Sequence, residues 1–239
     1  MKIALVGYGK MGKAIEETAL KRGHEIVCII DVNNLEDFDS DAFRSADVAI
    51  EFTIPASAPD NCLRCFAENV PVVIGTTGWL ERFSEIKEIC EKTGQTFFYA
   101  SNYSPGVNLF FAMNKYLAQM MNKYPMYNVS MEEMHHIHKL DSPSGTAITL
   151  AEDILKNIDR KKSWKESETV SDDELMITTY RKEEEPGYHS IIYDSDVDTI
   201  QISHNAKNRK GLALGAVIAA EFIQGKKGFF EMKDIFDLK

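Results

Sequence analysis

The sequence has few cysteines and no apolar run long enough to cross a membrane. Four cysteines among 239 residues do not make the disulfide framework of a small secreted domain, so we expect a reducing compartment. The most apolar stretch, residues 212–223, covers about twelve residues and contains a glutamate, whereas a spanning helix needs about 20. A charged segment followed by an apolar leader core is also missing at the start. We therefore expect a cytoplasmic protein that does not bind membranes.

The sequence also lacks an excess of positive charge. It has 27 Lys and Arg against 37 Asp and Glu, a net charge of −10, and a pI near 5.1. This balance argues against nucleic acid or an anionic membrane surface as a partner, although local groups can still hold small anions. An apolar fraction of 44% is ordinary for a globular protein, and the length allows one large domain or two modest ones.

The first hundred residues alternate short apolar runs with helix-length amphipathic ones. The runs are apolar throughout, which predicts strands buried on both faces in a parallel sheet. Right-handed crossovers through the intervening helices then predict a doubly wound, Rossmann-type α/β domain. The expected strands are Ile3–Val6, Ile26–Ile30, Val48–Phe52, Val70–Ile74 and Thr96–Tyr99, and the expected helices cover residues 11–22, 57–68 and 80–93.

The pattern changes after Pro105 and Gly106. Residues 160–185 are dense in charge and are interpreted as loops and a solvated face, while residues 197–203 alternate apolar and polar as in a sheet with one wet face. We therefore predict a second α+β domain with a mixed or antiparallel sheet, covering residues 105–205, and assign residues 1–104 and 206–239 to the first domain. The expected elements after residue 105 are helices over 107–124, 146–158 and 212–223 and strands over 127–134, 188–193 and 197–203.

A glycine-rich loop follows the first expected strand and opens the first helix. Its sequence, Gly7-Tyr8-Gly9-Lys10-Met11-Gly12, fits the G-x-G-x-x-G pattern. Gly7 permits the tight turn, Gly9 lets a pyrophosphate approach the backbone, and Gly12 lets the helix pack on the strand. Asp31, at the end of the second strand, can accept hydrogen bonds from ribose hydroxyls. The loop therefore predicts a dinucleotide site.

The residues after Asp31 indicate which dinucleotide is preferred. Val32, Asn33 and Asn34 offer no cation for a 2′-phosphate, so we expect NADH to be preferred over NADPH. Lys10 can partly rescue phosphate binding, which leaves NADPH as a second cofactor.

A second dense signal is a histidine cluster just after an expected strand. His135, His136, His138 and Lys139 lie within five residues. Three interpretations compete: a metal site, a polar surface strand, and an acid/base site that binds an anion. Adjacent histidines on an extended chain point to opposite sides, and no further ligand pattern completes a metal shell, so we predict no metal. The late histidines His189 and His204 are interpreted as structural hydrogen-bonding residues with room for a substrate-side role.

The residues that follow the cluster favour the acid/base interpretation. Ser144 is a plausible N-cap for the helix that begins near Thr146. The backbone N–H groups of Gly145 and Thr146 would then point at an anion such as a carboxylate. A proton donor, a cation and an anion cradle within a dozen residues predict a site for a small acid.

These motifs together carry a family resemblance. In order along the chain stand the glycine loop, Glu51-Phe52-Thr53, Gly75-Thr76-Thr77-Gly78, Ala100-Ser101-Asn102-Tyr103-Ser104, and His135-His136-Ile137-His138-Lys139-Leu140-Asp141-Ser142-Pro143-Ser144-Gly145-Thr146-Ala147. The chain resembles the 4-hydroxy-tetrahydrodipicolinate reductase family, also called dihydrodipicolinate reductase. The likeness spans nearly the whole chain, and the histidine-to-threonine string is its most specific part.

The resemblance implies an enzyme of the diaminopimelate branch of lysine biosynthesis. Such a reductase uses NAD(P)H to convert hydroxy-tetrahydrodipicolinate, with loss of water, to tetrahydrodipicolinate. It implies His135 as proton donor, Lys139 as its catalytic partner, and His136, Ser144, Gly145 and Thr146 at the substrate carboxylates. It further implies a homotetramer assembled through the second sheet. The residues implied at the cofactor are Gly7, Tyr8, Gly9, Lys10, Met11, Gly12, Asp31, Phe52, Thr53, Gly75, Thr76, Thr77, Ala100, Ser101, Asn102 and Tyr103.

Two features depart from the family pattern. Many members have a G-x-x-G-[KR]-M-G loop that is longer by one residue, and many carry a basic or polar residue where Ile137 stands. Two alternatives remain beside the family assignment. One is another two-domain NAD-dependent dehydrogenase acting on a small amino or keto acid, which explains the first hundred residues but not the histidine string. The other is a cofactor-sensing module without catalysis, which leaves His135 and Lys139 unused.

Overall fold

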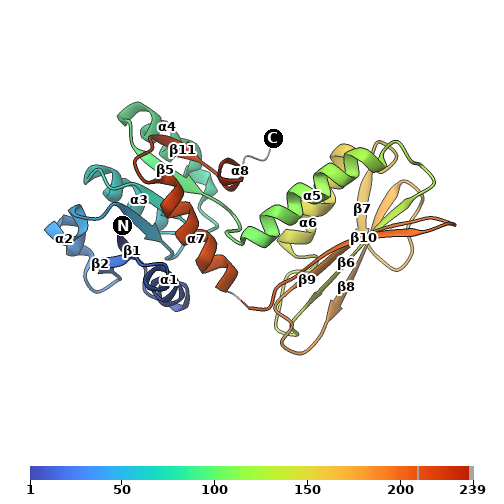
Figure 1. The fold of residues 1–239 in the computed structure, drawn as a ribbon, viewed down its shortest axis with the longest axis horizontal. Coiled ribbons are helices and arrows are strands. Elements are labelled where there is room, and N and C mark those ends of the chain that lie inside the picture. The colour runs from blue at the N-terminus through green and yellow to red at the C-terminus, as the bar shows by residue number, and fades with distance from the viewer. Residues whose placement is uncertain (209, 237–239) are drawn as a thin grey trace. The chain divides into compact units, whose positions relative to one another are not determined.

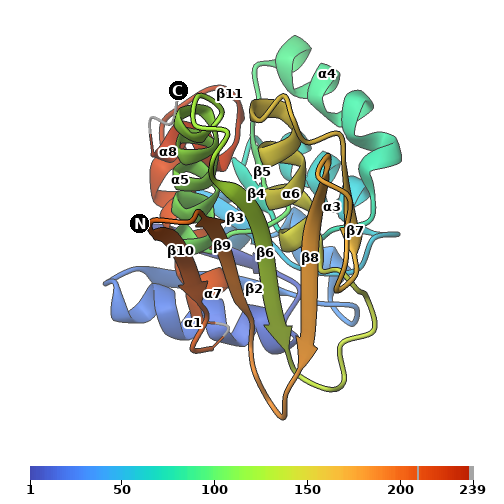
Figure 2. The same cartoon turned by 90° about the vertical axis from the view of Figure 1, so that its right-hand side faces the viewer.

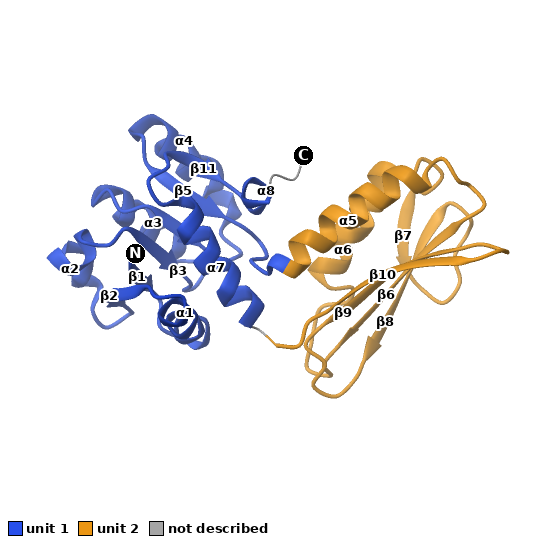
Figure 3. Cartoon of the chain, in the orientation of Figure 1, with its two compact units in different colours: residues 1–105, 210–239 blue, residues 106–209 orange. Residues whose placement is uncertain are grey.

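The computed structural model describes residues 1–208 and 210–236. The chain forms two compact units, Met1–Pro105 with Lys210–Lys239, and Gly106–Arg209 (Figures 1 and 3). The predicted boundaries, 104 and 206, therefore lie one and four residues before those of the structure. Among the described residues, helices that combine the length and apolar character needed to cross a bilayer are absent.

The first unit contains a six-stranded sheet whose strands pair in parallel, in the order β11-β5-β4-β3-β1-β2. This is the doubly wound arrangement that the sequence predicts. The strands are β1 (Lys2–Val6), β2 (Glu25–Ile30), β3 (Val48–Glu51), β4 (Val72–Ile74), β5 (Thr96–Tyr99) and β11 (Gly228–Phe230), and the helical segments are α1 (Lys10–Lys21), η1 (Leu35–Asp39), α2 (Asp41–Arg44), α3 (Ala58–Ala67), η2 (Leu80–Arg82), α4 (Phe83–Thr93), α7 (Lys210–Ile223) and α8 (Met232–Ile235).

Apolar clusters on both faces hold this sheet. On one face Ile3, Leu5 and Ile50 pack with residues of α1 and α7, and on the other Ala4, Val6 and Ala49 pack with residues of α2, α3 and α4. Because neighbouring residues of one strand face opposite layers, both must be apolar, which explains the unbroken apolar runs. The helix from the C-terminal segment, α7, thus completes the first unit.

The second unit contains a mixed sheet in the order β10-β9-β6-β8-β7. β6 pairs parallel to β8 and antiparallel to β9. Helices α5 and α6 pack on one face through a core that includes Phe110, Leu150 and Ile177, and Figure 2 shows both helices behind the strands. The elements are α5 (Pro105–Met121), β6 (Asn128–His135), α6 (Gly145–Asn157), β7 (Ser163–Glu166), β8 (Glu174–Arg181), β9 (Tyr188–Asp194) and β10 (Thr199–Asn205).

The interpretation of residues 160–185 as loops and a solvated face is wrong. This segment supplies two strands of the sheet, β7 and β8. Leu175 and Ile177 of β8 are fully buried and alternate with partly exposed residues. The charged residues lie in the flanking turns, on the edge strand β7 and on the solvent-exposed face of the sheet. A high density of charge in the segment therefore does not exclude the period-two alternation of buried residues in β8.

Candidate functional site

A pocket of about 540 Å³ lies at the carboxyl ends of β1, β2 and β3. β1 lies between β2 and β3 in the sheet, although β3 follows β2 in sequence, so the strand order reverses here. Open α/β sheets bind ligands at this reversal. The lining residues are Val6, Gly7, Tyr8, Gly9, Ile30, Asp31, Val32, Leu35, Phe52, Thr53, Ile54, Ala56, Ser57, Asp60, Asn61 and Arg64.

The three loop glycines have different surroundings. Gly7 has φ +93°, and a Cβ there would lie 2.1 Å from the Phe52 carbonyl oxygen. A Cβ on Gly12 would lie 2.3 Å from the Gly7 carbonyl oxygen, so only glycine lets α1 approach the loop. A Cβ on Gly9 would meet nothing within 4 Å. The loop is thus tight against the protein at Gly7 and Gly12 and open at Gly9, as a bound pyrophosphate requires.

Of the residues predicted for the cofactor, Gly7, Tyr8, Gly9, Asp31, Phe52 and Thr53 line this pocket. Gly75 instead makes room for the Phe52 ring, because a Cβ there would lie 1.9 Å from that ring. The Thr76 hydroxyl accepts the Thr53 N–H at 2.7 Å. Tyr103 is 2% exposed and donates to the Ile74 carbonyl. The predicted residues outside the lining are Lys10, Met11, Gly12, Gly75, Thr76, Thr77, Ala100, Ser101, Asn102 and Tyr103.

Arg64 is a pocket residue that the sequence analysis missed. It lies on α3, yet it lines the same pocket as Asp31 and Val32. Its guanidinium lies 5.2 Å from the centre of the Phe38 ring and donates to the Leu35 carbonyl oxygen at 3.3 Å. The pocket therefore contains a cation from a helix distant in the chain, which the residues of the glycine loop and those after Asp31 do not reveal.

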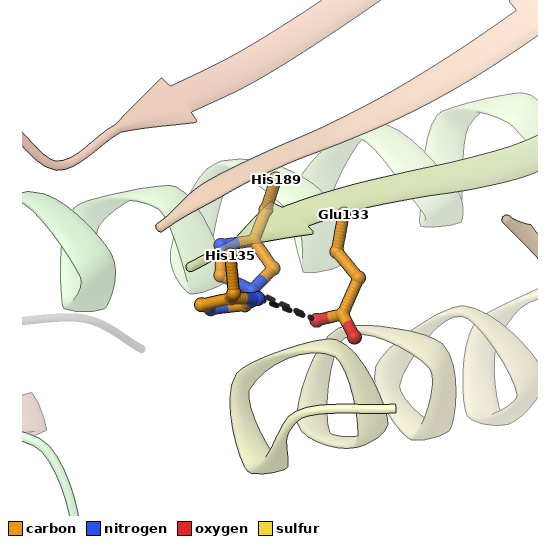
Figure 4. A group of neighbouring side chains, drawn as sticks. All are labelled: Glu133, His135 and His189. Carbon is orange, nitrogen blue, oxygen red and sulfur yellow. Dashed lines mark ion pairs between the residues drawn. The ribbon is translucent and has the colours of Figure 1, made fainter. Parts of the chain in front are cut away.

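A second cluster of chemically active side chains lies in the other unit (Figure 4). The buried Glu133 carboxylate faces two buried imidazoles, with Oε2 at 3.5 Å from Nδ1 of His135 and 3.4 Å from Nε2 of His189. Its other oxygen, Oε1, accepts the backbone N–H of Ser144 at 2.9 Å. The Ser144 hydroxyl lies 3.1 Å from Nε2 of His189. A carboxylate thus connects both histidines to the first turn of α6.

Strand periodicity and register build this cluster. Val129, Met131, Glu133 and His135 alternate along β6 on the face that α5 and α6 cover. The apolar core therefore gives way to polar groups at the carboxyl end of the strand. In the antiparallel pairing of β6 with β9, Glu133 lies directly opposite His189, so the two side chains share that face.

Burial and hydrogen bonding shift the ionisation of the cluster. Burial alone raises the pKa of Glu133, but hydrogen bonds from His189 and Ser144 outweigh it and hold this pKa well below its usual value. Burial lowers the pKa of His135, and attraction to Glu133 opposes that shift only in part. The site therefore holds an ionised carboxylate beside a His135 ring that is neutral near pH 7.

The start of α6 has the predicted N-cap. Ser144 is the N-cap, and its hydroxyl accepts the Ala147 N–H at 3.1 Å. Helix geometry leaves the N–H groups of Gly145 and Thr146 without partners inside the helix. Lys139 donates to both carboxylate oxygens of Asp141, at 2.8 and 2.9 Å, and this bond lowers the pKa of Asp141. Ile137 is 60% exposed.

Glu133 is not singled out by the sequence pattern, and His189 is interpreted from sequence as a structural hydrogen-bonding residue with room for a substrate-side role. The i, i+2 spacing of Glu133 and His135 on a strand was an available signal, because it places both side chains on one face. His189 comes close to Glu133 because β9 pairs with β6. The order of the strands in the sequence does not predict this pairing. Glu133, His135 and His189 could also supply three ligand atoms to a divalent cation, since these atoms lie within 4.8 Å of one another.

A glycine-loop pocket in one unit and an imidazole–carboxylate cluster in the other define a two-domain, dinucleotide-dependent oxidoreductase. The family model "Dihydrodipicolinate reductase, N-terminus" matches residues 1–103, and "Dihydrodipicolinate reductase, C-terminus" matches residues 106–236. The chain belongs to the dihydrodipicolinate reductase family. The predicted class, an NAD(P)H-dependent reductase of lysine and diaminopimelate biosynthesis, is thereby confirmed.

Two relatives are similar over nearly their full lengths. The chain is 49% identical over 235 residues to the 4-hydroxy-tetrahydrodipicolinate reductase of Christiangramia forsetii, covering 98% of this chain and 97% of that protein. It is 33% identical over 241 residues to the enzyme of the same name from Akkermansia muciniphila, covering 96% and 95%.

A solved structure shares the fold. A dipicolinate-bound dihydrodipicolinate reductase from Paenisporosarcina sp. TG-14 aligns with a TM-score of 0.75 and 23% identity, covering 98% of both chains. A myo-inositol dehydrogenase from Corynebacterium glutamicum aligns with a TM-score of 0.57 and 14% identity, covering 96% of this chain and 90% of that one. The two-domain fold is thus shared with dehydrogenases of other substrates, and the sequence matches distinguish the family.

Proposed function

We propose that this chain reduces 4-hydroxy-tetrahydrodipicolinate to tetrahydrodipicolinate, with loss of water, at the cluster in its second unit. The observation that carries this proposal is the buried Glu133–His135–His189 cluster beside the N-terminus of α6, in which His135 begins the family's most specific motif. The position of this acid/base group beside unpaired helix amides suits a substrate that carries carboxylates and must receive a proton.

Each residue has a part in this reaction. The amides of Gly145 and Thr146, with His136 and Ser144, hold a substrate carboxylate. Lys139 exchanges its partner Asp141 for the anionic substrate, which places a cation beside the nitrogen-bearing ring. His135 then gives a proton to the ring carbon next to the one that receives hydride.

The pocket of the first unit fits a dinucleotide. Gly9 leaves the backbone accessible, the start of α1 supplies amides for a pyrophosphate, and Asp31 stands where ribose hydroxyls lie. When bound, the nicotinamide supplies the hydride. We propose NADH as the preferred cofactor and NADPH as a second one, with Arg64 of the pocket lining, and Lys10 of the adjacent glycine loop outside that lining, as the cations available to a 2′-phosphate. The four cysteines are reduced and buried, which supports a cytoplasmic location.

We further propose a homotetramer assembled through the sheet of the second unit. The face of this sheet away from α5 and α6 carries apolar side chains that are only partly buried in the single chain. A second copy would cover them, since contiguous apolar surface on a soluble protein marks an interface. These side chains are Met134, Met176, Tyr180, Tyr188 and Ile192.

Oxidation of NADH in the presence of the proposed substrate tests the function. The substrate is unstable and is generated in situ from pyruvate and aspartate semialdehyde. We expect turnover with NADH, and a lower kcat/KM with NADPH. Absence of turnover with both cofactors would reject the substrate assignment, and a preference for NADPH would reject the cofactor assignment alone.

Substitutions in the same assay test the roles of the residues. We expect His135→Gln and Lys139→Ala each to lower kcat by about 10²–10⁴-fold, the usual contribution of a positioned acid or base. The Kd for NADH, measured by fluorescence, should stay nearly unchanged because neither residue lies in the dinucleotide pocket. Wild-type kcat in both variants would show that other residues carry the chemistry.

A further inference from the structure

The two oxygens of the Glu133 carboxylate have different partners. Oε1 accepts the Ser144 N–H at 2.9 Å. In the part of the chain that the structure describes, Oε2 is buried without a partner at ordinary hydrogen-bond geometry, and two ring nitrogens lie near it at ion-pair distance, Nδ1 of His135 at 3.5 Å and Nε2 of His189 at 3.4 Å. An ionised carboxylate can only accept hydrogen bonds. Both ring nitrogens must therefore carry hydrogen for the arrangement to be stabilising.

This requirement fixes the state of the His135 ring. In a neutral imidazole one nitrogen carries hydrogen and the other accepts. If Nδ1 holds the hydrogen toward Glu133, then Nε2 is the nitrogen that exchanges protons. Nε2 lies beside Gly187, where a Cβ would come within 3.2 Å of it. Gly187 has φ +150°, a backbone conformation that favours glycine. The glycine leaves the space beside Nε2 of His135 free of a side chain.

We propose that Glu133 is the positioning residue of His135: it holds the hydrogen on Nδ1, and so makes Nε2 the atom that passes the proton to substrate. This inference rests on the proposed function, in which His135 is the proton donor. In the reaction the Nε2–H bond of the imidazolium breaks and a C–H bond forms on the substrate. Nδ1 keeps its hydrogen, and Glu133 stays ionised throughout.

The same carboxylate connects the donor to the anion site. Because Oε1 binds the N–H of the α6 N-cap residue, the His135 ring and the helix amides share one rigid support. His189 faces Oε2 from β9 and its Nε2 lies close to the Ser144 hydroxyl, so the carboxylate is held from three elements. The low pKa of Glu133, caused by these hydrogen bonds, agrees with a permanent negative charge.

The variant Glu133→Gln reverses the hydrogen-bond polarity at nearly constant shape. Its amide oxygen would stay with the Ser144 N–H, so its NH₂ group would face the rings. Nδ1 of His135 must then accept, which moves the ring hydrogen to Nε2. Glu132→Gln is the matched control, because Glu132 is the neighbouring residue on β6 and its side chain points to the opposite sheet face.

Nitrogen-15 NMR of histidine-labelled protein with EDTA present detects this change without substrate or cofactor. We expect His135, assigned by comparison with His135→Gln, to be protonated at Nδ1 in the wild type and in Glu132→Gln, and at Nε2 in Glu133→Gln. A wild-type ring protonated at Nε2 would overturn the proposal even if Glu133→Gln did not fold. An unchanged tautomer in a folded Glu133→Gln variant would overturn it too.

Kinetics supply the second readout. We expect Glu133→Gln to lower kcat by about 10²–10⁴-fold, as removal of the orienting carboxylate does in other acid/base sites, with NADH affinity unchanged and partial recovery in Glu133→Asp. A wild-type kcat in Glu133→Gln would contradict positioning. The tautomer measurement needs no turnover. If the NADH assay rejects the proposed substrate, the NMR experiment still tests whether Glu133 positions the His135 ring.

Discussion

The proton that His135 is proposed to donate is not on the ring in the free chain. Burial lowers the His135 pKa below its usual value of 6.5, so the ring is neutral near pH 7. A bound dianion beside it favours the imidazolium and raises that pKa. We therefore expect a dicarboxylate to bind together with a proton.

We predict that dipicolinate, which the related Paenisporosarcina enzyme binds, takes up as much as one proton when it binds to this chain at pH 7. The uptake should fade above the raised pKa of the complex, where the ring stays neutral, and below the pKa of the free chain, where it is already charged. Calorimetry in buffers of different ionisation enthalpy measures it. His135→Gln should abolish the uptake, and equal uptake in that variant would assign the proton elsewhere.

At the scale of elements, the glycine loop combines two separate functions. Gly12 serves packing, because a Cβ there would collide with the Gly7 carbonyl oxygen at the start of α1. Gly9 is the position proposed for binding, because the protein leaves the space beside it open. The sequence pattern predicts the loop, but only the coordinates distinguish these roles by distance.

We predict opposite behaviour for two single-methyl substitutions. Gly9→Ala, at φ −76°, should leave the free energy of unfolding nearly unchanged and raise the Kd for NADH about tenfold or more, equivalent to about 1.4 kcal/mol. Gly12→Ala should destabilise the protein by about 1–3 kcal/mol through overpacking. Denaturant unfolding and NADH titration measure the two effects. A Gly9→Ala variant that binds NADH normally would place the pyrophosphate elsewhere.

The sheet of the second unit shows how element prediction depends on length and charge. β6 alternates regularly between buried and partly exposed residues, and the predicted ranges of β6 and β9 agree with the structure nearly to the ends of both strands. The sequence pattern does not reveal β8, because its apolar core residues Leu175 and Ile177 are only two and are flanked by charged and threonine residues. β11 has three residues, too few for a period to emerge, and it joins the sheet through pairing with β5.

At the scale of the whole molecule, the proposed tetramer depends on the open face of the second sheet. Ile192 lies beside Ser130 in the β9–β6 register and is partly exposed on that face. In a tetramer built through this sheet, a charge at Ile192 would be buried without a partner, at a cost of several kcal/mol.

We predict that the wild type elutes as a tetramer in size-exclusion chromatography with light scattering, and that Ile192→Glu yields smaller species. NADH binding should survive in that variant, because the dinucleotide pocket belongs to the other unit. Leu80→Glu is the control, because Leu80 is 56% exposed on the first unit. This substitution should leave the molar mass of the assembly, measured by light scattering, unaltered. A monomeric wild type would refute the assembly.

The sequence by itself determined the Rossmann-type unit, the glycine loop, the N-cap at Ser144 and the family. These features are local: they depend on strand or helix period, on turn chemistry, and on residues adjacent in the chain. Tertiary structure alone decided that Arg64 enters the pocket of Asp31 and that His189 reaches Glu133. Asp31 and Arg64 are 33 positions apart in the chain, and Glu133 and His189 are 56 positions apart. Residues so distant in sequence come together only when helices pack on the sheet and strands pair in register.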